Sequence, residues 1–511
     1  MEAILFAFEQ KETVMSNQQS DVKLKIGVKS FITVVALLLV VLIFVGVMTF
    51  VIPSGSYDTY PEGHPNAGQI IPDSFVEDEA EDRLPVWRWF TAPFESIIWG
   101  GSTKDAVTGE VKQTGAFNSN EVLIIALLLV LGGTFMVLER SGGLVSLVRV
   151  LIERLYKNRY LAIWIITFVL MILSAVFGLQ EQFLILYPIL YLFATAMNWS
   201  NFTAISFILI TSGVGFTTAL TNPFTIGAAV IAAQDVKGLE GLTVVDGLWY
   251  RAVIFVVMFV VTSLFLVWMA KNDEKRSNKP VDLSKFAFTS DEQRAVDRKN
   301  ALYVTLLFAI ALGGVIIAMA IPALRDLAMA IMAVCFVVGT VIIGRKLLGS
   351  FKEMFKAFFC GLKDVAPSII IILVAFAITY IAKKGEIIDY IFYKFYNLVL
   401  GSSPYVGVML LYVFVLILEF FIPSASAKAG LIIPMLTGAA IPGLSVNTII
   451  LSYLFADGYA NVLFPTCGTL LIGLGLADVS YAHWFKRTIL FQVILMAMSL
   501  GFLMLAVAMG Y

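Results

Sequence analysis

The fold is decided by the run YLAIWIITFVLMILSAVFGLQEQFLILYPIL at residues 160–190, which recurs as YVGVMLLYVFVLILEFFIPSASAKAGLIIPML at residues 405–436. Each run is apolar and is interrupted by a short polar tip. Each is followed by a second related segment, TSGVGFTTALTNPFTIG at 211–227 and LFADGYANVLFPTCGTL at 454–470. The chain therefore contains two copies of one pattern.

The spacing of matched landmarks supports an internal repeat. Three pairs of residues lie at nearly one offset, of 243, 246 and 242 positions: Gly142 with Gly385, Pro188 with Pro434, and Pro223 with Pro465. Self-similarity at a fixed spacing is the sequence signature of a repeat architecture.

The composition excludes several classes of protein. Of the 511 residues, 59% are hydrophobic and 14% are charged, whereas an ordinary soluble domain is about 45–50% apolar and about 25% charged. A soluble fold would have to leave this apolar excess on its surface. A soluble enzyme, a nucleic-acid binder and a disordered chain are therefore excluded, and we predict an all-α polytopic membrane protein surrounded by a lipid bilayer.

Charge placement sets the expected orientation. Residues 31–52 form a 22-residue stretch without a charge, long enough to span a bilayer. Loops 139–160 and 345–364 each carry five basic and two acidic residues, whereas 53–120 carries eleven acidic and four basic ones. An excess of lysine and arginine marks the cytoplasmic side. We expect a bacterial inner-membrane protein with a cytoplasmic N-terminus.

The expected organisation places the two copies in opposite orientations. A single unmatched span between them supplies the odd crossing that inverts the second copy, and inverted repeats are typical of secondary transporters. The expected parts are a cytoplasmic N-terminal segment at 1–30, membrane repeat 1 at 31–270 with an acidic external loop at about 53–120, a cytoplasmic linker at 271–300, a connecting helix at 301–322, and membrane repeat 2 at 323–511.

Each repeat is expected to contain a re-entrant hairpin with a polar tip. Its arms, such as 163–178 and 183–198, are too short to cross about 30 Å of hydrocarbon separately, so the tip would lie inside the membrane. The candidate binding residues at the tips are Gln180, Glu181 and Gln182 in repeat 1 and Ser424, Ser426 and Lys428 in repeat 2. A charge at that depth is expected to face protein or water.

Each repeat is also expected to contain a broken helix. Proline has no backbone N–H, so it leaves a backbone carbonyl group of the helix without its hydrogen bond. Such carbonyl groups, together with nearby side-chain hydroxyls, provide oxygen atoms that suit sodium or a polar substrate. The candidate residues are Thr221, Asn222, Pro223 and Thr225 in repeat 1 and Asp457, Asn461, Pro465 and Thr466 in repeat 2. Alternatives stay open, because the prolines could be simple kinks, Glu181 or Lys428 could belong to a structural ion pair, and Asp457 could support a helix cap.

These tips and breaks resemble the YfcC-type branch of the C4-dicarboxylate anaerobic carrier-like family, within the ion-transporter superfamily. The resemblance rests on FGLQEQ at 177–182, TNPF at 221–224, PSASAKAGLIIPML at 423–436, FADGYANVLFPT at 455–466 and HWFKR at 483–487. It implies a homodimer that works by an elevator movement, with dicarboxylates or basic amino acids as substrates.

The resemblance also carries residues over to this chain. It implies hairpin roles for Glu181, Ser424 and Ser426, and break roles for Asn222, Pro223, Pro465 and Thr466. Two departures move the site toward positive charge: Lys428 stands where the family usually has a Gln-like residue, and Gln182 where it usually has a second acid.

We therefore expect a secondary active transporter of small polar metabolites, an ion-coupled symporter or an exchanger. Lys428 and helix N-termini would favour a carboxylate, and Glu181 an amino or guanidino group, so amino acids, basic ones included, are the expected substrates. The alternative is a C4-dicarboxylate carrier, and a different class is a structural or sensory membrane protein. We expect no enzyme, no resident metal and no cofactor, apart from sodium or a proton as coupling ion.

Overall fold

The computed structural model describes most of the chain. The described residues are 28–56, 74–77, 84–99, 102–104, 111–113, 120–234, 236, 238–277, 287–321, 324, 327–385, 387–400, 402–438 and 443–511. The expected cytoplasmic segment 1–30 and the expected acidic loop 53–120 therefore lie largely outside the described residues.

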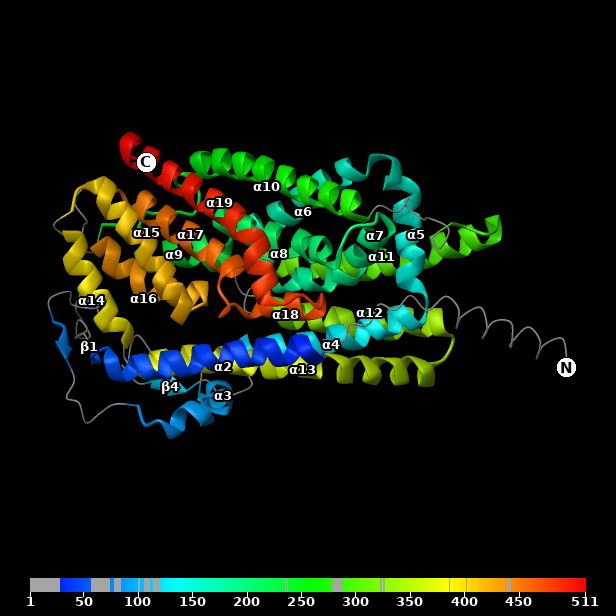
Figure 1. The fold of residues 1–511 in the computed structure, drawn as a ribbon, viewed down its shortest axis with the longest axis horizontal. Coiled ribbons are helices and arrows are strands. Elements are labelled where there is room, and N and C mark those ends of the chain that lie inside the picture. The colour runs from blue at the N-terminus through cyan, green and yellow to red at the C-terminus, as the bar shows by residue number, and fades with distance from the viewer. Residues whose placement is uncertain are drawn as a thin grey trace.

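The described chain is almost entirely helical, as its composition predicts. One group of helices packs together along one side of the molecule (Figure 1): α2 (Val28–Val51), α3 (Trp87–Trp99), α4 (Asn120–Arg140), α12 (Ala328–Leu348) and α13 (Phe351–Lys384). The long helix α11 (Asp291–Ala320) packs against α12. Within the described residues, seven helices are long and apolar enough to cross a membrane.

A second group of helices lies along the other side of the molecule and contains both predicted tip segments and both helix breaks (Figure 1). From the first repeat it contains α6 (Arg159–Phe177), the 3₁₀ turn η4 (Glu181–Leu186), α7 (Tyr187–Ala196), α8 (Asn201–Thr217), the π-helical turn η5 (Pro223–Gly227), α9 (Ala228–Gln234) and α10 (Leu248–Ser277). From the second it contains α15 (Pro404–Phe421), α16 (Ala425–Gly438), α17 (Val446–Leu463), α18 (Gly468–Leu476) and α19 (Tyr481–Met509).

Two short helices join the groups at opposite ends of the molecule. The arm α5 (Gly143–Leu155) follows α4 at one end, and the arm α14 (Ile387–Leu400) follows α13 at the other (Figure 1). Since α4 and α13 pack side by side, the chain leaves these two matching helices in opposite directions. This is the arrangement that an inverted repeat requires.

The order of elements repeats along the chain, because α4 to α10 recur as α13 to α19. The copies meet in reciprocal contacts where α8 crosses α17. A Cβ atom at Gly213 would meet Val462, and one at Gly458 would meet Thr217. The pairs 213/458 and 217/462 are each 245 positions apart. Position 213 thus contacts position 462, and their counterparts 458 and 217 contact each other in the same way, as residues related by a twofold axis do.

The remaining described elements are small. Strand β1 (Gly55–Ser56) pairs antiparallel with β2 (Val76–Glu77), and β3 (Ser102–Lys104) pairs antiparallel with β4 (Val111–Gln113). The 3₁₀ turn η3 (Tyr156–Asn158) joins α5 to α6.

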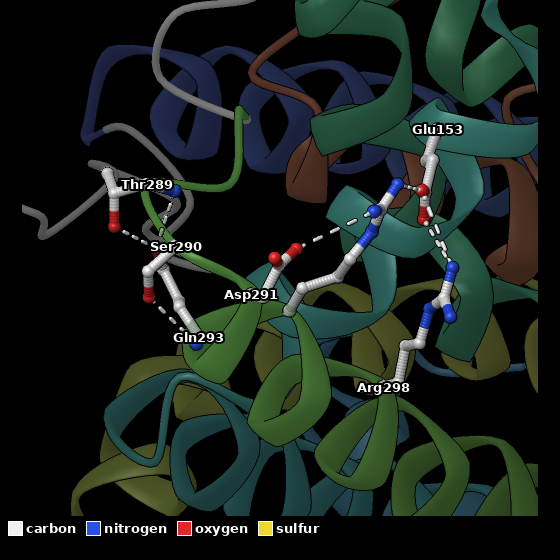
Figure 2. Close-up of polar contacts among 7 residues, drawn as sticks. Glu153, Thr289, Ser290, Asp291, Gln293 and Arg298 are labelled. Carbon is white, nitrogen blue, oxygen red and sulfur yellow. Dashed lines mark hydrogen bonds and ion pairs between the residues drawn. The ribbon is translucent and has the colours of Figure 1, made fainter.

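The expected linker at 271–300 is helical at both ends, since α10 continues to Ser277 and α11 begins at Asp291. Ser290 caps α11 by accepting a hydrogen bond from the Gln293 amide at 3.1 Å. Figure 2 shows this cap beside the α5 residue Glu153, which forms an ion pair with Arg298 at 3.4 Å. Local capping and a contact with the arm thus extend α11 ten residues beyond the expected span of 301–322.

The arms of the expected hairpins are present as helix pairs with unequal lengths. The first arms, α6 and α15, have 19 and 18 residues, or roughly 28 and 27 Å at 1.5 Å per residue. They are longer than the expected 163–178 and 405–421. The second arm of repeat 1, α7, has only 10 residues because the turn η4 precedes it.

Candidate functional site

The first break is built around the end of α6. Three successive amides, those of Leu220, Thr221 and Asn222, point to the Ala175 carbonyl, with N–O distances of 2.8, 3.1 and 3.1 Å. The Asn222 side chain then accepts a hydrogen bond from the Phe224 backbone amide at 2.9 Å and caps the turn η5, which begins at Pro223. The TNP motif thus ends one helix and begins another, as the sequence predicts.

Several predicted site residues keep polar atoms without a partner. Four of their amide and hydroxyl groups are buried and have no hydrogen-bond partner among the described residues: Gln180 Nε2, Asn222 Nδ2, Thr225 Oγ1 and Thr466 Oγ1. Buried polar groups are nearly always hydrogen-bonded in folded proteins. These amide and hydroxyl donors are therefore available to a bound carboxylate or to water.

The tip of the first hairpin contacts the second break. Glu181 begins η4, which packs against α18, and the Thr469 hydroxyl donates to Glu181 Oε1 at 3.2 Å. Beside it, Gln182 Oε1 accepts a hydrogen bond from the Gln180 backbone amide at 3.0 Å. A residue of repeat 1 thus faces a break of repeat 2.

The second hairpin makes the matching contact. Helix α16, whose first turn contains Ser426 and Lys428, packs against η5 and α9 of the first break. Ser424 precedes this helix and is exposed. The packing of each tip on the break of the other repeat brings the two predicted kinds of site together.

Lys428 lies at the centre of a buried cluster of charges. Its Nζ atom is 2.8 Å from Asp457 Oδ1 on α17 and also forms an ion pair with Glu419 on α15. The Ile422 carbonyl is 3.5 Å from the same nitrogen, and the ring centroid of Tyr453 is 5.7 Å away. Lys428 and Asp457 are 0% exposed and Glu419 is 1% exposed.

Asn461 connects this cluster to the second break. The Asn461 side-chain amide donates to the Asp457 carbonyl at 3.1 Å, and Asn461 Oδ1 accepts from the Cys467 thiol at 3.4 Å. Pro465 lies between α17 and α18, where the helix is interrupted. Asn461 thus links the first residues after the break to the charged cluster.

Lys428 forms buried ion pairs, and Glu181 forms none with the described residues. Among the described residues, Lys428 pairs with Glu419 and Asp457, whereas no basic residue pairs with Glu181. The expectation that Lys428 offers a free positive charge to a substrate carboxylate therefore does not match its contacts, because two acids already neutralise that charge.

Glu419 is a member of this charged cluster that the sequence argument missed. It directly follows the uncharged stretch 404–418 and is not among the predicted site residues. The repeat offered a signal: Glu419 matches Ser174 and Asp457 matches Ser212, both at an offset of 245. In repeat 1, the Ser174 hydroxyl donates to the Ser212 carbonyl at 2.7 Å.

The charged residues at and beside the two tips have a negative net charge. Three are acids, Glu181, Glu419 and Asp457, and one is a base, Lys428, so their summed formal charge is −2. In the described part of the chain, no group of three His, Cys, Asp or Glu side chains could hold a metal ion. A solvent-open hollow, lined by Phe288, Thr289, Ser290, Asp291 and Arg294, contains none of the predicted site residues.

Comparison with known proteins identifies one matching family. The family described as "C4-dicarboxylate anaerobic carrier" (DcuC) matches residues 29–508. A protein of Escherichia coli (strain K12), YfcC, whose name proposes a basic amino acid antiporter, is 23% identical over 516 residues, covering 93% of this chain and 96% of its own. An uncharacterised protein of Haemophilus influenzae (strain ATCC 51907 / DSM 11121 / KW20 / Rd) is 22% identical over 398 residues, covering 75% of this chain and 74% of its own.

Two solved transporter structures are also similar over most of their length. The YdaH transporter of Alcanivorax borkumensis is 14% identical, with a TM-score of 0.44, and the match covers 94% of this chain and 99% of that one. MtrF of Neisseria gonorrhoeae, described among antimetabolite efflux pumps, is 14% identical, with a TM-score of 0.40, and the match covers 92% and 94%.

Proposed function

The chain belongs to the C4-dicarboxylate anaerobic carrier (DcuC) family, and we propose that it carries amino acids, basic ones in particular. As a member of this family it is a multi-pass membrane transporter of small molecules and not an enzyme. It would act as a secondary active transporter, by exchange or by coupling to an ion. The alternative is transport of C4-dicarboxylates, as the family description has it.

The observation that carries this proposal is the unpaired acid at the first tip. Glu181 is half-buried and accepts a hydrogen bond from the Thr469 hydroxyl, and no described lysine, arginine or histidine neutralises it. A partly desolvated carboxylate attracts a cationic group, because charge-assisted hydrogen bonds to an ammonium or guanidinium are strong. The amino or guanidino group of a basic amino acid has this chemistry.

The breaks could bind the other end of such a substrate. Asn222 Nδ2, Thr225 Oγ1 and Thr466 Oγ1 are buried donors without a partner among the described residues, and amide and hydroxyl donors suit a carboxylate. A dicarboxylate would bring a second negative charge toward charged residues whose summed formal charge is −2. The charge of these residues therefore favours an amino acid over a dicarboxylate.

We also propose the inverted topology, the re-entrant tips, the elevator movement and the homodimer. The recurrence of α4 to α10 as α13 to α19, and the arms α5 and α14 at opposite ends (Figure 1), support two inverted copies. The bacterial inner membrane with a cytoplasmic N-terminus is supported by the basic loops 139–160 and 345–364. The family assignment excludes the alternative of a structural or sensory membrane protein without transport.

The test is binding and counterflow with purified protein. Lysine, arginine, a neutral amino acid and succinate are compared by thermal shift, and the ligands that stabilise the protein are then followed into proteoliposomes. Glu181→Gln should weaken lysine binding by about 10–100-fold, which corresponds to the loss of roughly 1.5–3 kcal/mol for a hydrogen bond to a charged group.

The matched control is Glu292→Gln, since Glu292 is an exposed acid in the first turn of α11. Lysine affinity should be unchanged in this variant. Stabilisation by succinate but not by lysine would favour the dicarboxylate alternative and overturn the proposal. Equal lysine affinity in the wild type and the Glu181→Gln variant would remove Glu181 from the site.

A further inference from the structure

The Lys428 ammonium group occupies a position built like a cation site. Oxygen atoms from three places converge on it: a carboxylate of α15, a carboxylate of α17 and the Ile422 carbonyl at the end of α15. That carbonyl is available because α15 ends at Phe421 and Ile422, which precedes Pro423, is not helical. Carboxylate and backbone carbonyl oxygens are also the ligands that hard cations prefer.

The position requires a positive charge. Glu419 and Asp457 are both buried, and two buried carboxylates close together are costly unless a cation compensates them. Among the described residues, Lys428 is the only base that pairs with either acid. The Lys428 side chain therefore provides the positive charge that a bound cation would otherwise provide.

The repeat shows that the helix packing itself does not need these charges. At the matching positions of repeat 1, Ser174 and Ser212 join the corresponding helices by one hydrogen bond of 2.7 Å from a hydroxyl to a carbonyl. The same pair of helices therefore packs with neutral residues in one copy and with three charges in the other. A role in transport explains this difference better than a role in folding does.

We propose that the Lys428 ammonium takes the place of a coupling cation at the second hairpin, so that transport needs no sodium ion bound between Glu419 and Asp457. The inference rests on the proposed transport function and deepens it. A resident ammonium cannot leave the protein during a transport cycle, so this site adds no sodium gradient to the driving force. Exchange of substrates is then favoured over sodium symport.

The experiment measures thermal unfolding without substrate, so its result does not depend on which substrate is carried. The wild-type midpoint should be the same in sodium chloride and in choline chloride of equal ionic strength. Lys428→Ala removes the ammonium group and leaves space between two acids. The midpoint of this variant should be lowered in choline chloride and should rise saturably with sodium or methylammonium chloride.

Two further variants complete the test. Lys486→Ala removes an exposed lysine of α19 and should respond to cations as the wild type does. Lys428→Ala combined with Glu419→Gln keeps the formal charge of the cluster at −1, and so gives a folded test protein if the single variant does not accumulate. It should also be stabilised by methylammonium more than by choline, through Asp457.

Saturable stabilisation of the wild type by sodium would overturn the proposal. The proposal would also be overturned if neither sodium nor methylammonium stabilised either of the two Lys428 variants. If the cation response appears in the variants while lysine and arginine fail to bind the wild type, the proposed substrate is wrong and the inference about Lys428 stands.

Discussion

Gly213→Ala should destabilise the protein, and Val462→Ala should restore much of the loss. A Cβ atom at Gly213 would lie 1.9 Å from Val462 Cγ2, whereas ordinary contact begins at 3.4 Å. The helices α8 and α17 would therefore have to separate by roughly 1.5 Å, and overpacking of this kind costs about 1–3 kcal/mol. The next atoms, the Gly458 carbonyl oxygen and Val462 Cβ, are 3.3 and 3.4 Å away, so removing the valine methyl groups relieves the clash.

The reciprocal contact provides the control, because it should not be rescued. A Cβ atom at Gly458 would lie 2.2 Å from the Thr217 amide nitrogen and 2.4 Å from its Cα atom, and no side-chain truncation moves these backbone atoms. Gly458→Ala combined with Thr217→Ala should therefore remain as unstable as Gly458→Ala alone. At Gly501 of α19 nothing lies within 4 Å, so Gly501→Ala should be neutral or stabilising by up to about 1 kcal/mol.

The assay is the midpoint of thermal unfolding in detergent, followed by tryptophan fluorescence, for each single and double variant. Val462→Ala alone should cost about 1.6 kcal/mol for its two methyl groups. The double variant Gly213→Ala/Val462→Ala should be more stable than the sum of the single changes by about 1–2 kcal/mol, within the range of coupling between contacting residues. Additive effects, or equal rescue at both glycines, would refute the reciprocal packing of the two repeats.

Two further predictions concern the N-terminal cap of α17 and a buried ion pair between α5 and α11. Ser445→Ala removes the cap that accepts a hydrogen bond from the Thr448 amide at 3.1 Å, and it should cost about 0.5–2 kcal/mol; an unchanged unfolding midpoint would contradict this. Arg149 and Asp297 form a buried ion pair of 3.0 Å between α5 and α11, so Arg149→Met should cost about 3–5 kcal/mol by leaving the acid unpaired. Arg149→Met with Asp297→Leu should be closer to the wild type in the same unfolding assay, and a double variant less stable than Arg149→Met would count against this reading.

Much of the architecture could be predicted because it depends on local chemistry. Apolar runs of spanning length predicted the helices, and the prolines at 223 and 465 predicted the breaks, which the structure places between α8 and α9 and between α17 and α18. The landmarks at offsets of 242 to 246 predicted the repeat. Helix ends were less well predicted, since a cap such as Ser290 extends α11 independently of hydropathy.

The site was predicted only in its components. The sequence marked Glu181, Lys428 and Asp457 as charges in apolar surroundings, but it did not indicate which of them touch. Glu419 was missed because it adjoins an uncharged stretch and has no distinguishing neighbour along the chain. Its role depends on the hairpin turn that brings Lys428 back against α15 and on the packing of α17 beside both.

Hydropathy, proline and glycine act within a few residues of where they stand, so the sequence alone predicts a helical membrane protein with two copies of one pattern. The three-dimensional packing shows in addition that the tip residue Glu181 contacts Thr469 of the other repeat and that two acids pair with Lys428. Glu181 and Thr469 are 288 positions apart, and contacts of that kind follow from the crossing of helices. Hydropathy specifies that these helices are buried, whereas the partners of the buried charges follow from how the two repeats pack together.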